Sequence, residues 1–238
     1  MQTSFENKSA ARTAVWDTLE SEGVARFPFP PHGRIPNFEG ARQAAERLFE
    51  ELPLAHAAHI KVNPDAPQRH VRIVALERGC VVYVPTPRLR GGFKRLDPRT
   101  IPDDELPEAA SLSNMDQWAE PVPLDDLPAH DAIVTGSVAV TRDGRRCGKG
   151  EGYSDLEYAI LRELGHDPVP VATTVHPLQI VDAVPSDRHD LPLSLIVTPD
   201  KTITIDEPPS PPGGIDWATL SEEDLDDMPV LRTLQQRT

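Results

Sequence analysis

The sequence predicts an α/β domain, and three patterns indicate it. Residues 59–63 and 80–84 are short apolar strands joined by a helical pattern over 67–78, and strand–helix–strand is the unit of a parallel sheet. Further helical stripes and strand-like runs alternate along the rest of the chain. A chain of 238 residues, 38% of them hydrophobic, is long enough for one such domain with a tail.

Two amphipathic helices are predicted before the first strand. Residues 8–25 and 40–51 both repeat apolar side chains at helical spacing. The stretch between them, 26–38, holds four prolines, which exclude a helix and a central strand. This stretch is too apolar for a solvated linker, so we expect its large side chains to pack onto the domain: Phe27, Phe29, Ile35 and Phe38.

The second half of the chain alternates shorter elements. Residues 88–127, which include an acidic run, are expected to be mostly loop. A helix is predicted from Asp155 to Glu163, with Gly165 as its stop. Strands are predicted at 130–135, 138–141 and 169–175, and a hairpin around Pro199-Asp200 at 193–198 and 201–205.

The composition changes near the C-terminus. Residues 207–214 contain four prolines and two glycines, which is typical of a linker. Ser221 and Asp224 have the spacing of a capping box before a short helix. The apolar side chains beyond it could dock on the domain, or the acidic tail could be largely disordered. The predicted division is a domain over 1–206 and a proline-rich linker with an acidic tail over 207–238.

The charge balance disfavours two classes of partner. The chain carries 38 acidic and 24 basic side chains, a net charge of −14, which argues against binding nucleic acid or an anionic membrane. No apolar run approaches the roughly 20 residues that span a bilayer, and no signal peptide is visible. We therefore expect a cytoplasmic protein. Only five of the basic residues are lysines, so we also expect a halophilic protein, with codon bias as the alternative explanation.

The most informative motif is the glycine-rich run RRCGKGEGYSD at 145–155, between a predicted turn and a predicted helix. Glycines let backbone N–H groups point at one anion without Cβ clashes, and a helix N-terminus adds partial positive charge. We predict a phosphate cradle, in which Asp155 could hold Mg²⁺. A plain glycine-rich turn is the alternative, because neither a Walker A motif nor a dinucleotide fingerprint is present. The cradle residues are Gly148, Gly150 and Gly152 with Arg145, Arg146 and Lys149.

Other polar residues carry weaker signals. Lys8 and Arg12 lie four apart on the first helix, which fits a second phosphate clamp or a solvated helix face. His176 follows a predicted strand, where sheet proteins often contact ligands, but an ordinary edge histidine fits as well. The two cysteines, Cys80 and Cys147, are too few for a disulfide framework or a structural zinc site.

These motifs resemble a known family. The run GKGEGYSDLEYA at 148–159 resembles the glycine-rich signature of the 5-formyltetrahydrofolate cyclo-ligases, and Lys8-x-x-x-Arg12 is similar to the basic pair that opens their sequences. The segments GRIPNFEGA, KVNPDAPQ, VPTPRL and GSVAV resemble the methenyltetrahydrofolate-synthase-domain-containing subgroup. Together the resemblance extends over residues 8–182.

The resemblance implies a three-layer α/β/α fold with a mixed, mainly parallel sheet. It also implies the ATP- and Mg²⁺-dependent conversion of 5-formyltetrahydrofolate to 5,10-methenyltetrahydrofolate. The implied nucleotide contacts are Lys8, Arg12, Gly148, Gly150, Gly152 and Tyr153, with Asp155 for the metal. The implied catalytic residues are Lys149, Tyr153 and Arg145, and the expected folate contacts are Trp118, Glu120, His176 and Gln179.

Two residues depart from the family pattern. Glu151 places a carboxylate inside the predicted cradle, and Ser154 replaces the second tyrosine of the signature. A carboxylate beside phosphates weakens binding unless a cation neutralises it. These departures leave a non-catalytic nucleotide- or folate-binding relative as one alternative to the enzyme. An RNA-associated protein is another, because the resemblance extends to relatives that carry an added RNA-recognition domain.

Overall fold

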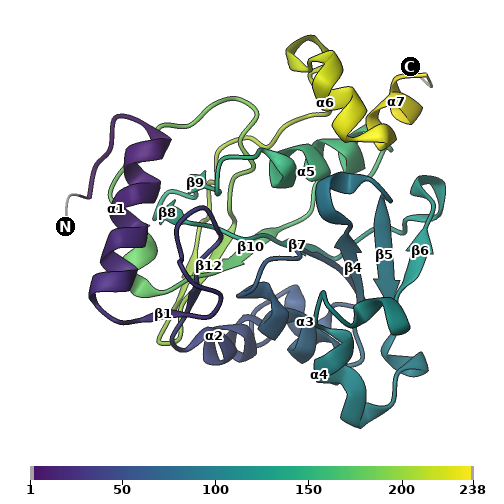
Figure 1. Ribbon diagram of the computed structural model, residues 1–238, viewed down its shortest axis with the longest axis horizontal. Helices are drawn as coiled ribbons and strands as arrows, with labels where there is room; N and C mark the ends of the chain where they lie inside the picture. The colour runs from purple at the N-terminus through teal and green to yellow at the C-terminus, as the bar shows by residue number, and fades with distance from the viewer. Residues whose placement is uncertain (1–2, 237–238) are drawn as a thin grey trace.

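A computed structural model, which describes residues 3–236, contains one large sheet with helices on both faces (Figure 1). The sheet order is β13-β12-β10-β7-β3-β4-β5-β6. The five strands from β12 to β4 run parallel, and the strands at both edges are antiparallel to their neighbours. The predicted α/β fold is confirmed. The strands are β3 (His59–Val62), β4 (Val81–Pro85), β5 (Phe93–Leu96), β6 (Glu120–Val122), β7 (Ala132–Val134), β10 (Val171–Thr174), β12 (Leu195–Val197) and β13 (Thr202–Thr204).

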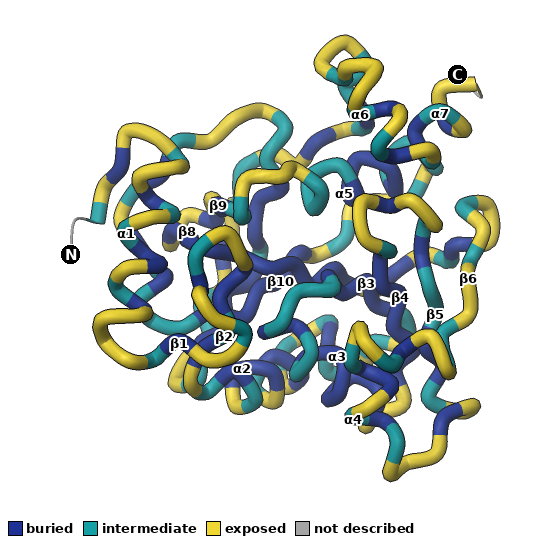
Figure 2. Tube along the Cα trace, in the orientation of Figure 1, coloured by how far each residue is buried: buried dark blue, intermediate teal, exposed yellow. Residues whose placement is uncertain are grey.

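Helices cover the two faces of this sheet because successive residues of each central strand point in opposite directions. Ile60 and Val62 of β3 belong to a core cluster with α2, α3 and α4, whereas Ile133 of β7 belongs to one with α5, α6 and α7. Figure 2 shows the buried strands between these layers. The helices are α1 (Lys8–Ser21), α2 (Ala41–Leu48), α3 (Gln68–Glu77), α4 (Leu106–Ala109), α5 (Tyr153–Glu163), α6 (Glu222–Asp227) and α7 (Pro229–Gln235).

A smaller sheet lies beside the large one and supports α1. Its order is β11-β8-β9, and a separate two-stranded sheet pairs β1 with β2. Val15 and Leu19 of α1 are buried in a cluster with Val138 and Val181 of the small-sheet region. This packing brings the first turn of α1 next to the glycine-rich run. The short strands are β1 (Ala25–Arg26), β2 (Asn37–Phe38), β8 (Ala139–Thr141), β9 (Arg146–Cys147) and β11 (Ile180–Val181).

The proline-rich stretch packs differently from the prediction. Ile35 and Phe38 are buried as expected, but the side chains of Phe27 and Phe29 are 78% and 57% exposed. The stretch folds back through the β1–β2 pair, and the Trp16 indole N–H donates to the Arg34 carbonyl at 3.0 Å. This arrangement anchors the second half of the stretch and leaves its first half projecting into solvent.

Residues 88–127 are also more ordered than predicted. They contain β5 and β6, which extend the sheet beyond β4. Both strands are short. Lys94 and Arg95 of β5 and Glu120 of the edge strand β6 are charged, and such residues hide the apolar alternation of a strand. Single-turn 3₁₀ helices in this region lie at Pro87–Leu89, Pro98–Thr100, Asp103–Glu105, Met115–Gln117 and Leu124–Asp126, and others elsewhere lie at Leu54–His56, Pro177–Gln179 and Trp217–Thr219.

The C-terminal tail is docked on the domain. Leu225, Met228, Leu231 and Leu234 are buried in the cluster that includes α5. Ser221 and Asp224 form the predicted capping box at the start of α6. Within residues 3–236, no helix combines the length and apolar character needed to cross a membrane.

Candidate functional site

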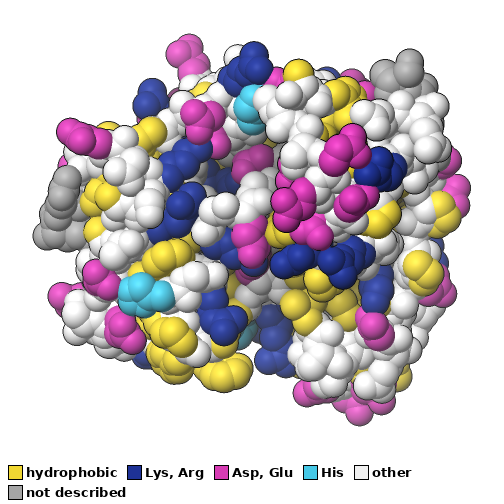
Figure 3. All heavy atoms as spheres, turned by 45° about the horizontal axis from the view of Figure 1, so that its top comes forward, with side chains coloured by type: hydrophobic (Ala, Val, Ile, Leu, Met, Phe, Trp, Pro, Cys, Tyr) yellow, Lys and Arg dark blue, Asp and Glu magenta, His cyan; other side chains and the backbone are white. Residues whose placement is uncertain are grey.

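A cleft of about 850 Å³ opens at the carboxyl ends of the parallel strands, which is where open α/β sheets bind ligands. More basic than acidic side chains line it, although the chain as a whole is acidic. Figure 3 shows Lys and Arg side chains around this hollow. The cleft therefore suits a ligand with several negative charges. Its charged residues are Lys8, Arg12, Arg34, Arg69, Arg72, Arg88, Arg146 and Lys149 against Asp65, Glu151, Asp155, Glu157 and Asp190.

The glycine-rich run forms one wall of the cleft, as a loop that joins β9 to α5. Gly150 has φ +110° and Gly152, the residue before α5, has φ +72°, conformations that favour glycine. A Cβ at Gly150 would lie 3.2 Å from the Arg12 guanidinium carbon. The Arg12 Nε donates to the Gly148 carbonyl at 2.7 Å. The structure thus brings Arg12 and the glycines together, as predicted.

Lys8 begins α1 and lies at the same wall. Its Nζ donates to Asp190 at 2.6 Å and to Asp187 at 2.9 Å. Partial burial opposes its charge, but the hydrogen bonds to Asp190 and Asp187 outweigh this and raise the pKa of Lys8. Lys8 is therefore a cation held in the cleft by acidic partners.

Lys149 lies between two carboxylates. Its Nζ is 2.8 Å from Glu151 and 3.9 Å from Asp65. Burial lowers the pKa of Lys149. The hydrogen bond to Glu151 and the charge of Asp65 raise this pKa by more than burial lowers it, so the net shift is upward. Burial raises the pKa of Asp65, against the opposing charge of Lys149. Glu151 is therefore neutralised inside the loop by the adjacent lysine.

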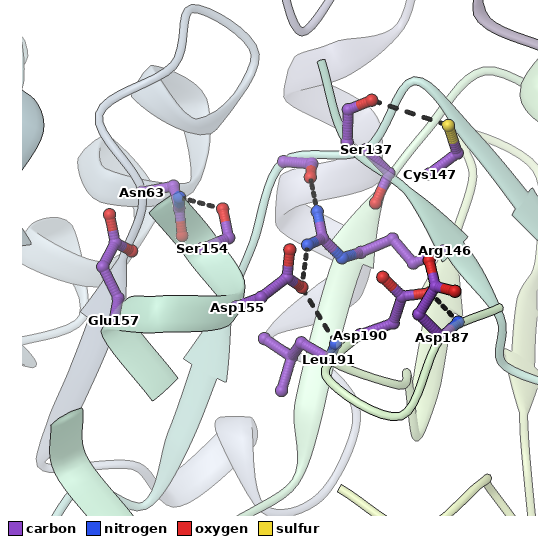
Figure 4. Close-up of polar contacts among 12 residues, drawn as sticks. Asn63, Ser137, Arg146, Cys147, Ser154, Asp155, Glu157, Asp187, Asp190 and Leu191 are labelled. Carbon is purple, nitrogen blue, oxygen red and sulfur yellow. Dashed lines mark hydrogen bonds and ion pairs between the residues drawn. The ribbon is translucent and has the colours of Figure 1, made fainter. Parts of the chain in front are cut away.

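Asp155 lies in the first turn of α5 and is held by two donors (Figure 4). Its Oδ1 accepts from Arg146 Nη2 at 2.7 Å and from the Leu191 N–H at 2.9 Å. Arg146 also donates to the Gly136 carbonyl at 2.8 Å. Asp155 therefore links the helix, β9 and the segment that carries Asp190.

The floor of the cleft is a buried polar network. Lys61 pairs with Glu157 of α5, and its Nζ donates to Asn63 Oδ1 at 2.7 Å. Asn63 Nδ2 donates to Ser154 Oγ at 2.8 Å (Figure 4). Burial raises the pKa of Glu157, and the charge of Lys61 opposes this shift. The network ties the end of β3 to the first turn of α5.

Five of the predicted site residues lie outside the lining of the cleft. Arg145 pairs with Asp143 at 3.1 Å, while Trp118 donates to Glu105 at 3.1 Å and Glu120 pairs with Arg95 at 2.5 Å. His176 caps a 3₁₀ helix, and the buried Gln179 donates to the Ser137 carbonyl at 2.8 Å. The contacts of His176 and Gln179 hold the chain after β10 against the small sheet.

Several residues of the cleft have no role in the sequence-based prediction, among them Asn63, Asp65, Glu157 and Asp190. Asn63 and Asp65 follow β3 directly, so the rule that ligands bind at the carboxyl ends of parallel strands would have found them. Glu157 lies one turn beyond the glycine-rich run, where only the tertiary pairing with Lys61 marks it. Asp190 lies in a loop with no motif, and only its contact with Lys8 marks it.

Asp155 is the carboxylate placed to meet a magnesium ion that comes with phosphates, because both oxygens of Asp190 already accept from Lys8. Within residues 3–236, no group of three or more His, Cys, Asp or Glu side chains is placed to hold a metal unaided. Asp155 and Asp190 both line the cleft beside the glycine-rich loop. Mg²⁺ commonly uses one or two carboxylates, with phosphate oxygens and water completing its shell.

Comparison with known proteins identifies related sequences. The family model for the 5-formyltetrahydrofolate cyclo-ligase family matches residues 6–199. A methenyltetrahydrofolate synthase domain-containing protein from Mus musculus is 44% identical over 238 residues, which cover 97% of this chain and 64% of that protein. The 5-formyltetrahydrofolate cyclo-ligase of Escherichia coli K12 is 34% identical over 80 residues, which cover 34% of this chain and 41% of that enzyme.

The chain thus spans slightly less than two thirds of the length of the mouse relative. Among solved structures, the NMR structure of Aquifex aeolicus 5,10-methenyltetrahydrofolate synthetase has a TM-score of 0.53 at 16% sequence identity. The match covers 85% of this chain and 95% of that one. It shows that the two chains share a fold.

Proposed function

Because this chain belongs to the 5-formyltetrahydrofolate cyclo-ligase family, we propose that it uses MgATP to convert 5-formyltetrahydrofolate to 5,10-methenyltetrahydrofolate. The observation that carries the proposal is the cation-lined cleft at the glycine-rich loop. Nucleotide and folate are both anions, and the cleft gathers basic side chains on a chain whose net charge is −14. Its volume of about 850 Å³ is within the usual range for small-molecule sites.

The proposed reaction asks the protein for positioning and charge neutralisation. The formyl oxygen attacks the γ-phosphorus of ATP, and the bond to ADP breaks. N10 of the folate then attacks the activated formyl carbon and loses its proton, and inorganic phosphate departs with the former formyl oxygen. No covalent enzyme intermediate is needed, so preorganised cations and N–H groups account for the catalysis.

The nucleotide phosphates are proposed to lie against the glycine-rich loop. The backbone N–H groups of Gly150 and Gly152, together with the N-terminus of α5, would face them. Arg12 and Lys149 would neutralise their charge, with Lys8 alongside. A bound Mg²⁺ would supply positive charge that offsets the charge of the phosphates. Asp155 is the carboxylate that would hold it, and Asp190 would join only if Lys8 moved from it to a phosphate.

The folate is proposed to occupy the remainder of the cleft. Asp65 presents a largely buried carboxylate there, which is suited to accept hydrogen bonds from ring N–H groups. Phe27 and Leu112 also line the cleft and are 78% and 47% exposed, so a bound ring could cover apolar surface that otherwise faces water. Phe27 and Leu112 replace Trp118 and Glu120 as our candidates for contact with the ring.

One observation favours a second candidate function, that of a non-catalytic binding protein. Lys149 pairs with Glu151 at 2.8 Å, so part of the positive charge of the loop is already neutralised. A phosphate must compete with Glu151 for this lysine. Such competition would permit nucleotide binding while weakening the stabilisation of the transferred phosphoryl group.

A turnover assay tests the proposal. Purified protein is mixed with 5-formyltetrahydrofolate and MgATP at NaCl concentrations from 0.1 to 2 M, and the methenyl chromophore and ADP are measured together. We expect equal amounts of both products. Lys149→Ala is expected to lower kcat/KM by roughly a hundredfold, because it removes a charged partner of the phosphates.

The matched control is Lys201→Ala, which removes an exposed lysine in the turn between β12 and β13 and should leave turnover unchanged. If folded wild-type protein binds MgATP but forms neither product, the cyclo-ligase proposal is rejected in favour of the binding protein. If Lys149→Ala and Lys201→Ala behave alike, the phosphate site lies elsewhere.

A further inference from the structure

We infer that Ser154 presents its hydroxyl proton to the bound ligand, as a hydrogen-bond donor oriented by Asn63 and Lys61. The inference rests on the proposed function and assigns a role to a residue that departs from the family pattern. Ser154 lines the cleft in the first turn of α5. The contact that orients it comes from the end of β3, 91 residues away in sequence.

Lys61, whose side chain is 1% exposed, decides which atoms of the network donate and which accept hydrogen bonds. An ammonium group has donors only, so both of its partner atoms must be acceptors. Lys61 pairs with the Glu157 carboxylate and donates to Asn63 at 2.7 Å. The Asn63 atom that faces Lys61 must therefore be the carboxamide oxygen.

This requirement fixes the opposite end of the Asn63 side chain. With its oxygen toward Lys61, Asn63 directs its NH₂ group at Ser154 Oγ, 2.8 Å away. Asn63 is 3% exposed, and its backbone N–H and carbonyl are both hydrogen-bonded, to Val134 and Arg72. A turned amide would place its NH₂ group against the Lys61 ammonium, donor against donor, so the observed orientation is the favoured one. Ser154 Oγ is the acceptor in this contact, and its own proton remains to be donated.

The cleft is the place where this proton can find a partner. Among the residues that the structure describes, none accepts a hydrogen bond from Ser154. An uncommitted hydroxyl proton beside an anion site favours an oxygen acceptor on the ligand. Two oxygens of the proposed reactants qualify, namely a phosphoryl oxygen of the nucleotide and the formyl oxygen of the folate.

Binding measurements on Ser154 variants test the inference. Calorimetry measures the affinity for a non-hydrolysable ATP analogue with Mg²⁺ and, separately, for 5-formyltetrahydrofolate. The two affinities show whether the oxygen that accepts from Ser154 belongs to the nucleotide or to the folate. Ser154→Ala is expected to weaken one of the two ligands roughly tenfold to a hundredfold. Ser154→Thr keeps the hydroxyl and is expected to restore the affinity to within a few-fold of wild type.

Asn63→Asp tests the orientation of the proton. An aspartate still accepts from Lys61, but its second oxygen would now accept from Ser154 and withdraw the proton from the ligand. In the Asn63→Asp background, Ser154→Ala should therefore cost little further affinity. Melting temperatures show whether each variant is folded, and if Asn63→Asp does not fold, the Ala and Thr variants of Ser154 decide the matter.

The possible failures are distinguishable. If wild type binds neither ligand, the proposed function fails and the inference fails with it. If wild type binds both ligands and Ser154→Ala binds them equally well, only the inference is overturned. It is overturned as well if Ser154→Ala costs the same affinity with Asn63 or with Asp at position 63.

Discussion

The role available to a side chain in this protein depends on its hydrogen-bond and ion-pair partners. Glu151 and Asp155 are both carboxylates beside the same loop, yet their environments differ. Glu151 is exposed and pairs with Lys149, whereas Asp155 accepts from the buried Arg146 and from the Leu191 N–H. Asp155 is thereby positioned at the cleft wall, and Glu151 remains free to leave its lysine when a phosphate arrives.

His130 is a second residue whose behaviour follows from its surroundings. It is 5% exposed and packs between Tyr83 and His166, with ring centroids 5.0 and 6.1 Å away. Neither ring nitrogen has a hydrogen-bond partner among the described residues. Burial, followed by the charge of His166, lowers the pKa of His130 to about 3. The folded protein therefore keeps this ring neutral under mildly acidic conditions.

This shift predicts acid sensitivity. The unfolded chain binds a proton at position 130 below about pH 6.5, whereas the folded chain does so only near pH 3, so stability falls as the pH drops through this window. At pH 5 the loss is about 2 kcal/mol relative to pH 7. Urea denaturation at the two pH values measures it. His130→Phe should reduce the difference, and an equal difference in wild type and variant would contradict the assignment.

At the scale of elements, the C-terminal helices belong to the core. Leu231 of α7 is completely buried, in the same cluster as Tyr158 of α5. Asp227 at the end of α6 also lies 3.2 Å from Arg88 and 3.4 Å from Arg90, in the loop after β4. Since Arg88 lines the cleft, the tail contacts a segment that borders the candidate site.

Because the tail is docked, shortening one of its buried side chains is predicted to lower the stability of the protein markedly. Leu231→Ala is expected to lower the free energy of unfolding by about 3 kcal/mol, because it leaves a cavity in the core. Chemical denaturation measures the loss. Thr233→Ala on the same helix changes an exposed residue and should have little effect. Two small and similar effects would mean that the tail is not docked in solution.

At the scale of the whole molecule, the charges are segregated. The net charge is −14, while the cleft gathers basic side chains on the face seen in Figure 3. Outside the cleft, like charges repel one another and destabilise the compact chain. Salt screens this repulsion, because the Debye length falls from about 10 Å at 0.1 M to about 3 Å at 1 M.

The acidic balance therefore predicts stabilisation by salt. Raising NaCl from 0.1 to 2 M should increase the free energy of unfolding by on the order of 1 kcal/mol, or the melting temperature by about 2–4 °C. A thermal melt at several salt concentrations measures the change, most of which should occur below 1 M if screening is the cause. A melting temperature that stays constant or falls would contradict the halophilic prediction.

The sequence by itself determined the pattern of local elements. Apolar periodicity identified α1, α2, α3, β3, β4 and the β12–β13 hairpin to within a few residues, because a helix or strand leaves its own spacing in the chain. The glycines at 148, 150 and 152 and the basic pair Lys8 and Arg12 indicated an anion site, and the structure brings them together. Motif resemblance identified the family, which the family model confirms.

Tertiary structure alone decided what completes the cleft. Glu157 and Asp190 come from separate segments, and no local pattern connects either of them to the cleft. Lys61 and Glu157 meet only because β3 lies beneath α5, and Asp190 reaches the site only through its contact with Lys8. Conversely, the polar side chain of Gln179 donates to two backbone carbonyls just before β8 and does not reach the cleft. Local spacing reports burial and backbone shape, whereas the partner of a polar side chain depends on which distant segments pack beside it.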